Sequence, residues 1–418
     1  MKILWFVNIA LPEASSLMNM EPIPFGGWMV KASSTLAAEP GIELSVAFPQ
    51  VGLNKVQILH GNRIKYFAYP PIEENYLKSP YAQWLQEILD YTKPDVIHIF
   101  GTEYVHTLAI VDFYQGRNVV ISIQGLTSIY YQHYMAAVPA DVQKRFTLRD
   151  FIKQDNLIQQ QNKFKHRGIH EIASLQKTKH IIGRTNWDRI CTSQINPQAQ
   201  YHFCNETLRD EFYKHRWDID KCERYSIFIS QSSYPIKGLH VLLEAMPLIS
   251  KRFPQTKIYI SGHSIVKSDS WLDKLKISSY GRYIKGLIDK YHLQDKVIFT
   301  GILNEKEMCE RFLKSHVFVS PSVVENESNS LSEAKIMGVP SVASYVGGVI
   351  DRINHGVDGF LYPFDASYML AYFICEIFAH DELALGFSQN ARENANLLHD
   401  PQTNLHTLID IYKKICFQ

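Results

Sequence analysis

The sequence lacks an apolar run long enough to cross a membrane, because even its hydrophobic region 359–380 contains Asp365 and Glu376. It also lacks a charge bias: the formal net charge is +1, so no overall field favours nucleic acid as a partner. The six cysteines form no C-x-x-C pair and no zinc-type spacing with histidine, which argues against a disulfide framework or a metal site of that kind. These absences predict a cytoplasmic protein with reduced thiols, no nucleic-acid partner and no metal cofactor.

Short apolar runs alternate with longer helical patterns along the chain. The 418 residues are too many for one ordinary core and suit two domains of roughly 200 residues each. The alternation is typical of βαβ units, so we predict an α/β fold of two doubly wound halves with parallel sheets. The expected strands cover residues 2–7, 44–48, 95–100, 119–123 and 180–183 in the first half, and 225–230, 257–262, 296–301, 316–322 and 340–344 in the second.

The boundary between the halves lies in residues 205–224, a polar and charge-rich stretch without a strand pattern. We therefore expect a first domain over residues 1–210 and a second over 211–400. Residues 401–418 read as a terminal helix, which could pack back on the first domain.

The segment "PSVVENESNSLSEAKIMGVPSVASYVGG", residues 321–348, follows an expected strand and contains a helix that ends at Gly338. In open α/β sheets, ligands bind beyond the carboxyl ends of the strands. The N-terminus of such a helix offers free backbone N–H groups and the positive end of its dipole to a phosphate. The alternative is a solvated loop with an ordinary helix cap, in which Glu333 only balances the dipole.

The segment also resembles the E-x7-E region of the retaining glycosyltransferases of family 4, with Glu325 and Glu333 as the two acids. The resemblance extends over most of residues 225–365 and includes a series of glycines after Gly338. It implies a GT-B fold, in which two Rossmann-like domains face a cleft and the second holds the sugar nucleotide. The form "ENESNSLSEA" is most similar to members that build bacterial surface polysaccharides.

The resemblance implies a role for each matching residue of the segment. Glu333 would bind the donor ribose, and Glu325 the hydroxyl groups of the donor sugar. It assigns no role to Glu327. Backbone groups of four consecutive residues would contact the diphosphate: Ser328, Asn329, Ser330 and Leu331.

Lys237 and Gly238 follow the expected strand 225–230 and precede an amphipathic helix over 239–252. A lysine there can neutralise the charge that develops on a departing diphosphate, and family members carry a similar Lys-Gly pair. They also carry an arginine at the strand end, where this chain has Gln231. A neutral amide can hydrogen-bond a phosphate but brings no charge.

Candidates in the first domain also follow expected strands. Gly26 and Gly27 resemble a glycine pair that family members carry near the reacting centre, and the resemblance implies that they contact the donor. Gln124 stands where they often have a histidine; it cannot act as a general base and could only orient a sugar. Glu103 is a candidate acid or acceptor-binding group. Arg184 could bind a phosphate or an acceptor, or pair with a carboxylate.

The expected reaction is transfer of a hexose from a UDP- or GDP-sugar to a hydroxyl group of a glycan or lipid-linked acceptor, with retained configuration and without a metal. Glu325, Lys237, Gln124 and Glu103 are the candidate catalytic residues. Residues 141–170 mix basic and aromatic side chains, as on a helix that touches an anionic membrane from the cytoplasmic side or on a merely solvated helix. Two other functions remain open: a sugar-nucleotide epimerase, and a decayed transferase that only binds the donor.

Overall fold

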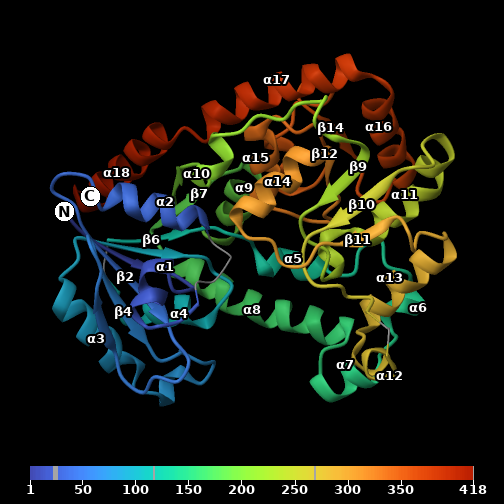
Figure 1. Ribbon diagram of the computed structural model, residues 1–418. Coiled ribbons are helices and arrows are strands. Elements are labelled where there is room, and N and C mark those ends of the chain that lie inside the picture. The colour runs from blue at the N-terminus through green and yellow to red at the C-terminus, as the bar shows by residue number, and fades with distance from the viewer. Residues whose placement is uncertain (22–26, 116–117, 268–269, 418) are drawn as a thin grey trace. The chain divides into compact units, whose positions relative to one another are not determined.

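The computed structural model describes residues 1–21, 27–115, 118–267 and 270–417, and they form two compact units (Figure 1). Unit 1 comprises Met1–Ser128, His166–Arg209 and His399–Gln418. Unit 2 comprises Ile129–Lys165 and Asp210–Leu398. The boundary expected near residue 210 therefore coincides with one of the crossings, and the terminal helix belongs to unit 1. Residues 129–165 differ from the expectation, because they belong to unit 2.

Unit 1 is built on an eight-stranded sheet of order β3-β4-β2-β1-β5-β6-β7-β8. The strand pairs are parallel apart from β3 with β4. The central strands β1 and β5 are almost entirely buried, because helices cover both faces of such a sheet. The strands are β1 (Lys2–Phe6), β2 (Glu43–Pro49), β3 (Gln57–His60), β4 (Ile64–Tyr69), β5 (Val96–Phe100), β6 (Val119–Ser122), β7 (His180–Gly183) and β8 (Gln200–Phe203).

The C-terminal helix α18 (Pro401–Phe417) packs against α2 and β5 of this unit. The Tyr412 hydroxyl accepts a hydrogen bond from Trp5 Nε1 at 2.9 Å and lies 2.6 Å from His98 Nδ1. Leu405, Ile409 and Tyr412 of α18 therefore belong to the apolar core of unit 1. The other helices are α1 (Pro12–Leu17), α2 (Gly27–Leu36), η1 (Tyr76–Lys78), α3 (Tyr81–Thr92), α4 (Val105–Phe113) and α9 (Asn186–Ile195).

Unit 2 contains a six-stranded parallel sheet of order β11-β10-β9-β12-β13-β14. The order reverses between β9 and β12, and such a switch point opens a crevice at the carboxyl ends of the strands. The five strands expected in this half are confirmed, and β14 was not expected. The strands are β9 (Glu223–Ile229), β10 (Lys257–Ile260), β11 (Val297–Phe299), β12 (Ser315–Ser320), β13 (Ser341–Ser344) and β14 (Phe360–Tyr362).

The helices of unit 2 cover this sheet. The expected amphipathic helix 239–252 is α11, whose apolar face is buried. The helices are α10 (Asp210–Tyr213), η2 (Pro235–Lys237), α11 (Leu239–Arg252), α12 (Trp271–Lys276), α13 (Ser279–Lys290), α14 (Glu305–Lys314), α15 (Asn329–Met337), η3 (Gly347–Asp351), α16 (Ser367–Ala379) and α17 (Asp381–Leu398).

Residues 129–165 leave unit 1 within α5 (Thr127–His133) and return within α8 (Leu157–Lys177). Between them, α6 (Ala140–Gln143) and α7 (Leu148–Lys153) pack on unit 2, with α7 beside α12 (Figure 1). The buried Asp150 carboxylate joins the two parts by accepting a 2.8 Å hydrogen bond from the Ser279 N–H. None of the helices in the described ranges is long and apolar enough to span a membrane.

Candidate functional site

A polar pocket of about 230 Å³ lies at the carboxyl ends of β9 and β12, at the switch point of the unit 2 sheet. It brings together predicted residues from two separate loops. The predicted residues that line it are Gln231, Lys237, Glu325, Ser328, Asn329 and Ser330. A pocket of this kind at this place fits the phosphates and sugar of a nucleotide ligand better than an apolar molecule.

The pocket is bounded by the N-terminus of α15. Ser328 is the N-cap residue, and its Oγ accepts a hydrogen bond from the Leu331 N–H at 3.3 Å. Gly338 ends the helix with φ +79°, a conformation that glycine adopts without strain. The predicted helix is therefore confirmed, and so is the cap that the alternative interpretation required. A cap does not remove the dipole, so the N-terminus still favours an anion.

Lys237 and Glu325 form an ion pair in this pocket, with 2.6 Å between Nζ and Oε2. Ser322 Oγ donates a further bond of 3.3 Å to the same carboxylate oxygen. Burial disfavours the charged lysine, but the attraction of Glu325 outweighs burial and raises the pKa of Lys237 above its usual value. Lys237 is therefore a permanent positive charge at neutral pH.

Position 238, directly after Lys237, can hold only a glycine. Its φ is +67°, and a Cβ added there would lie 1.8 Å from the carbonyl oxygen of Pro321. The loops after β9 and β12 therefore touch at this point, and the Val323 N–H donates to the Ile236 carbonyl oxygen at 2.8 Å. This contact is what places Lys237 beside Glu325.

A second glycine pair supports the backbone of Glu325. The Gly348 N–H donates to the Glu325 carbonyl oxygen at 3.1 Å. A Cβ on Gly347, whose φ is +49°, would lie 1.9 Å from the same oxygen. Only a residue without a side chain fits so close to that backbone, so the pair fixes the loop that carries Glu325.

Glu327, to which the resemblance assigned no role, forms a buried bidentate ion pair with Arg352. Arg352 Nε and Nη2 lie 2.8 Å and 3.0 Å from the two carboxylate oxygens. Nearby, Lys335 of α15 pairs with buried Asp358 at 2.8 Å. These pairs attach the segment after β13 to the loop before α15 and to α15 itself. Sequence reasoning missed them, although all four residues lie within residues 225–365, over which the resemblance extends.

Tyr130 is a further residue that sequence reasoning missed. It belongs to the part of α5 assigned to unit 2, and its hydroxyl accepts a 2.7 Å hydrogen bond from the Asn326 N–H. The same hydroxyl lies 3.5 Å from Glu325 Oε1, where it can donate. No motif marks this tyrosine, since its contact spans almost 200 positions of the chain.

Glu333 lies one turn into α15 and is 6% exposed. It follows Asn329 by four positions and so shares its helix face. Its predicted contact with a ribose stays a prediction, as does the contact of the buried Leu331 backbone with a diphosphate.

Two candidates of unit 1, Gln124 and Arg184, meet at Glu206. Arg184 Nη1 lies 2.6 Å from Glu206 Oε2, and Gln124 Nε2 donates to Glu206 Oε1 at 3.0 Å. Of the two roles proposed for Arg184, the structure shows the pairing with a carboxylate. A contact of Arg184 with a phosphate or acceptor, and of Gln124 with a sugar, stay predictions.

Glu103 has the chemistry of a candidate acid. Its Oε2 is buried and has no hydrogen-bond partner within the described ranges. Burial, aided by the charge of Glu171, raises the pKa of Glu103 to about 7. Glu171 itself was missed: its carboxylate accepts from the N–H groups of Thr127 and Ser128 at 3.0 Å and 2.9 Å and so caps α5.

The glycine pair of unit 1 is only partly described. Gly26 lies outside the described residues. Gly27 is the first residue of α2, and a Cβ there would lie 2.4 Å from Cδ of Arg209. Its part in donor binding stays a prediction.

Residues 210–394 match the family model described as glycosyl transferases group 1. An uncharacterised glycosyltransferase of Methanocaldococcus jannaschii is 30% identical over 142 residues, which make up 34% of this chain and 32% of that protein. The chain spans less than half the length of the first curated relatives that it matches, at 32%, 16% and 46%.

Solved structures resemble the chain over nearly its whole length. Sucrose-phosphate synthase from Thermosynechococcus elongatus gives a TM-score of 0.73 at 18% identity and covers 99% of this chain and 98% of its own. HepE from Anabaena, in complex with UDP and glucose, gives 0.66 at 14% identity and covers 99% of both chains. These likenesses confirm the predicted GT-B fold class with two Rossmann-like domains.

Proposed function

Because residues 210–394 match the group 1 glycosyl transferases, we propose that the protein is a glycosyltransferase of the retaining kind, a member of family 4. It moves a hexose from a nucleotide diphosphate sugar to a hydroxyl group of a glycan or a lipid-linked acceptor. The observation that carries this proposal is the polar pocket of unit 2, where Lys237, Glu325 and the N-terminus of α15 converge. An epimerase is not favoured by these comparisons.

The pocket offers the electrostatics that departure of a nucleoside diphosphate needs. In the proposed reaction, the bond between the anomeric carbon and the phosphate oxygen breaks, and the acceptor oxygen bonds to the same face of that carbon. The acceptor proton passes to the departing phosphate oxygen. Lys237 and the α15 N-terminus stabilise the negative charge on the diphosphate, and Glu325 accepts hydrogen bonds from the sugar hydroxyl groups. No metal is required for these steps.

The polar pocket indicates the class of donor, a nucleotide diphosphate sugar, but not its base or its sugar. HepE, whose fold resembles this one, is described with UDP and glucose, which makes a UDP-hexose the first donor to test. A thermal-shift screen with UDP, GDP and ADP would identify the base, because a ligand that binds only the folded state raises its apparent stability.

Two substitutions test the assigned roles. Lys237→Met removes the charge, and we expect kcat to fall by about 10²–10³-fold because the leaving group loses its counter-charge. Glu325→Gln keeps the shape, and we expect weaker donor binding together with slower transfer. Nucleoside diphosphate release with and without acceptor measures both. Unchanged activity in both variants would refute the proposal, and tight donor binding without turnover in the wild type would support a decayed transferase.

We infer that the acceptor is presented at an anionic membrane surface, because unit 2 exposes apolar side chains beside lysines. Phe146, Phe151, Ile152 and Trp271 are 62–70% exposed, which is unusual for such large side chains. Residues 144–153 carry four basic residues: Arg145 and Arg149 pair with aspartates, and Lys144 and Lys153 are exposed. The α7–α12 patch consists of Phe146, Leu148, Phe151, Ile152, Trp271 and Leu275.

Exposed aromatic and aliphatic side chains framed by lysines suit the boundary between headgroups and acyl chains. Each lysine or arginine near an anionic surface adds about 1 kcal/mol of attraction. Peripheral contact of this kind fits a cytoplasmic enzyme that elongates a lipid-linked surface polysaccharide. Membrane attachment and cellular location are parts of the proposal, separate from the transfer reaction.

Vesicle sedimentation tests the patch. We expect binding to phosphatidylcholine vesicles only when phosphatidylglycerol is included, and loss of binding in Phe151→Ser, Ile152→Ser, Trp271→Ser. A matched control replaces Tyr368 and Leu397 by serine, because these unit 2 side chains are 65% and 78% exposed but lie outside the patch. Equal binding of patch variant and wild type would overturn the inference, as would a patch-dependent dimer that binds no vesicles.

A further inference from the structure

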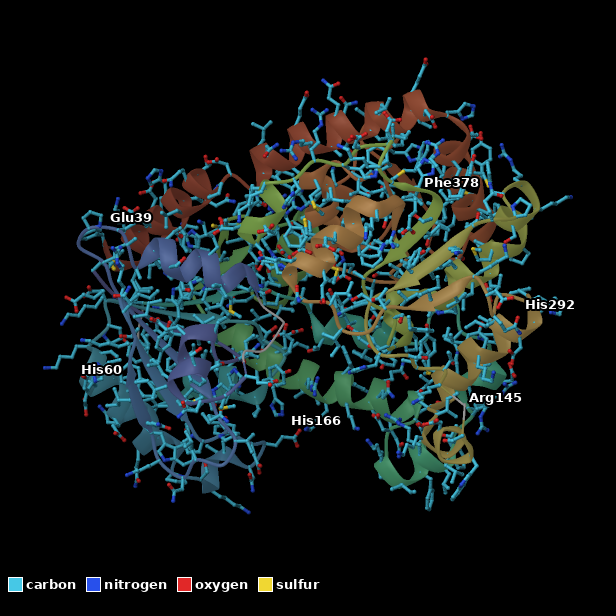
Figure 2. All side chains as sticks on the ribbon, in the orientation of Figure 1. Glu39, His60, Arg145, His166, His292 and Phe378 are labelled. Atoms are coloured by element: carbon cyan, nitrogen blue, oxygen red, sulfur yellow. The ribbon has the colours of Figure 1, made fainter. Side chains whose placement is uncertain are left out.

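A cluster of three potential metal ligands lies in unit 1, on residues that the proposed reaction does not use. His166 and His170 stand one turn apart on α8, and Glu74 comes from the segment between β4 and η1. One ligand atom from each residue lies within 4.8 Å of the other two. Figure 2 labels His166, whose side chain is half exposed. We propose that Glu74, His166 and His170 bind a divalent transition-metal ion, with Zn²⁺ as its representative.

The spacing on α8 suits a metal. Side chains four positions apart lie on one helix face, so both imidazoles can turn toward one point. The two ring centroids are 5.1 Å apart, with an angle of 84° between the ring planes. His166 Nε2 and Glu74 Oε1 are 3.0 Å apart, close to the distance of about 3.4 Å that separates two ligand atoms on a tetrahedral zinc ion.

The state of His170 also points to a ligand. Its Nε2 is buried and has no hydrogen-bond partner within the described ranges, which leaves a nitrogen lone pair or N–H group unsatisfied. A bound cation would satisfy that nitrogen.

Two basic residues of α8 close in sequence to the cluster have partners elsewhere. The Arg167 guanidinium lies over the ring of Tyr104, 5.4 Å from its centre, and Lys163 pairs with Asp155 at 3.1 Å. Two imidazoles and one carboxylate favour zinc, nickel or copper over magnesium or calcium. Three protein ligands leave a coordination position for water. The metal would tie the segment after β4 to α8 within unit 1.

Zinc stoichiometry tests the site in the full-length protein. Wild type, His170→Gln and Glu74→Gln are dialysed against buffered Zn²⁺ and analysed for bound metal. We expect the His170→Gln protein to bind one equivalent less, and Glu74→Gln to bind it about tenfold or more weakly. The six free cysteines are present in every variant, so any zinc bound to them is the same in wild type and variant and does not affect the comparison. His60→Gln, an exposed histidine of the same unit, is the matched control.

Two further measurements separate this site from the thiols and from a simple ion pair. Co²⁺ bound here should show visible d–d bands without a thiolate charge-transfer band. Zn²⁺ should raise the melting temperature of the wild type by about 2 °C or more and leave that of His170→Gln unchanged. Equal zinc content in wild type and His170→Gln would overturn the proposal and reduce the cluster to the Glu74–His166 ion pair.

Discussion

Replacing Arg352 by methionine should destabilise unit 2 severely. The Glu327 and Arg352 side chains are only 1% and 4% exposed, and two hydrogen bonds of 2.8 Å and 3.0 Å join them. Removing the arginine leaves a carboxylate buried without its cation, which typically costs about 3–5 kcal/mol. The loss is large because water cannot replace the arginine at so buried a position.

Hydrogen exchange of the β12 amides in dilute urea reports the stability of this unit. A loss of about 3–5 kcal/mol should accelerate exchange by roughly two to nearly four orders of magnitude. The matched control is Arg224→Met, because Arg224 and its partner Asp381 are 35% and 55% exposed in the same unit. An exposed pair contributes about 0–1 kcal/mol, so the control should change exchange by less than about tenfold.

The double substitution Glu327→Leu, Arg352→Met removes both charges together. We expect it to be less destabilising than Arg352→Met alone, because no unpaired charge remains buried. The reasoning would be refuted if Arg352→Met proved no more costly than Arg224→Met. It would also fail if the double variant were as unstable as the sum of its two single changes.

Gly347→Ala should abolish binding of UDP or GDP in a thermal-shift assay, because the added Cβ would lie 1.9 Å from the Glu325 carbonyl oxygen. The control is Gly356→Ala, which should still bind the nucleotide, because Gly356 also has a positive φ of +77° but has open space around it. Tyr130→Phe removes the hydroxyl that accepts the 2.7 Å hydrogen bond from the buried Asn326 N–H. It should lower the free energy of unfolding of unit 2 by about 1–3 kcal/mol. An unchanged midpoint in urea unfolding would contradict this contact. The pKa of Glu103 is raised to about 7 in the folded state, so the folded protein holds the carboxyl proton more tightly than the unfolded chain does. The free energy of unfolding should therefore decrease as the pH rises from 4.5 to 7. Over that pH range the melting temperature of Glu103→Gln should decrease less steeply with pH than that of the wild type. Equal slopes for the two proteins would contradict the raised pKa.

The sequence was informative wherever a pattern is local. Parallel strands buried on both faces read as continuous apolar runs, so β1, β5, β6 and β12 were predictable. The loop after β12 was recognisable because a strand, a short polar stretch and a glycine-terminated helix follow one another. Three strands of unit 1 were not expected: β3, β4 and β8. The edge strands β3 and β8 have only four residues each, which include glutamine and histidine and form no long apolar run. In β4, Lys65 interrupts the apolar run.

Contacts between distant positions could not be read from the sequence in the same way. Glu327 and Arg352 lie 25 positions apart, and no sequence pattern between them indicates that they form an ion pair. Residues 129–165 follow strands of unit 1, and only the folded structure shows that they pack on unit 2. Tyr130 was missed for this reason.

The path of the chain between the units has a consequence for engineering. Exchanging residues 210–398 between related proteins is an obvious way to test the proposed donor binding, because these residues carry the polar pocket. In this chain the exchange would leave the host's Tyr130 and α7 against a foreign loop and helix, in place of those whose Asn326 and Ser279 backbone N–H groups they bind. A chimaera that transfers residues 129–165 together with 210–398 keeps these bonds, and should fold where the simpler exchange does not.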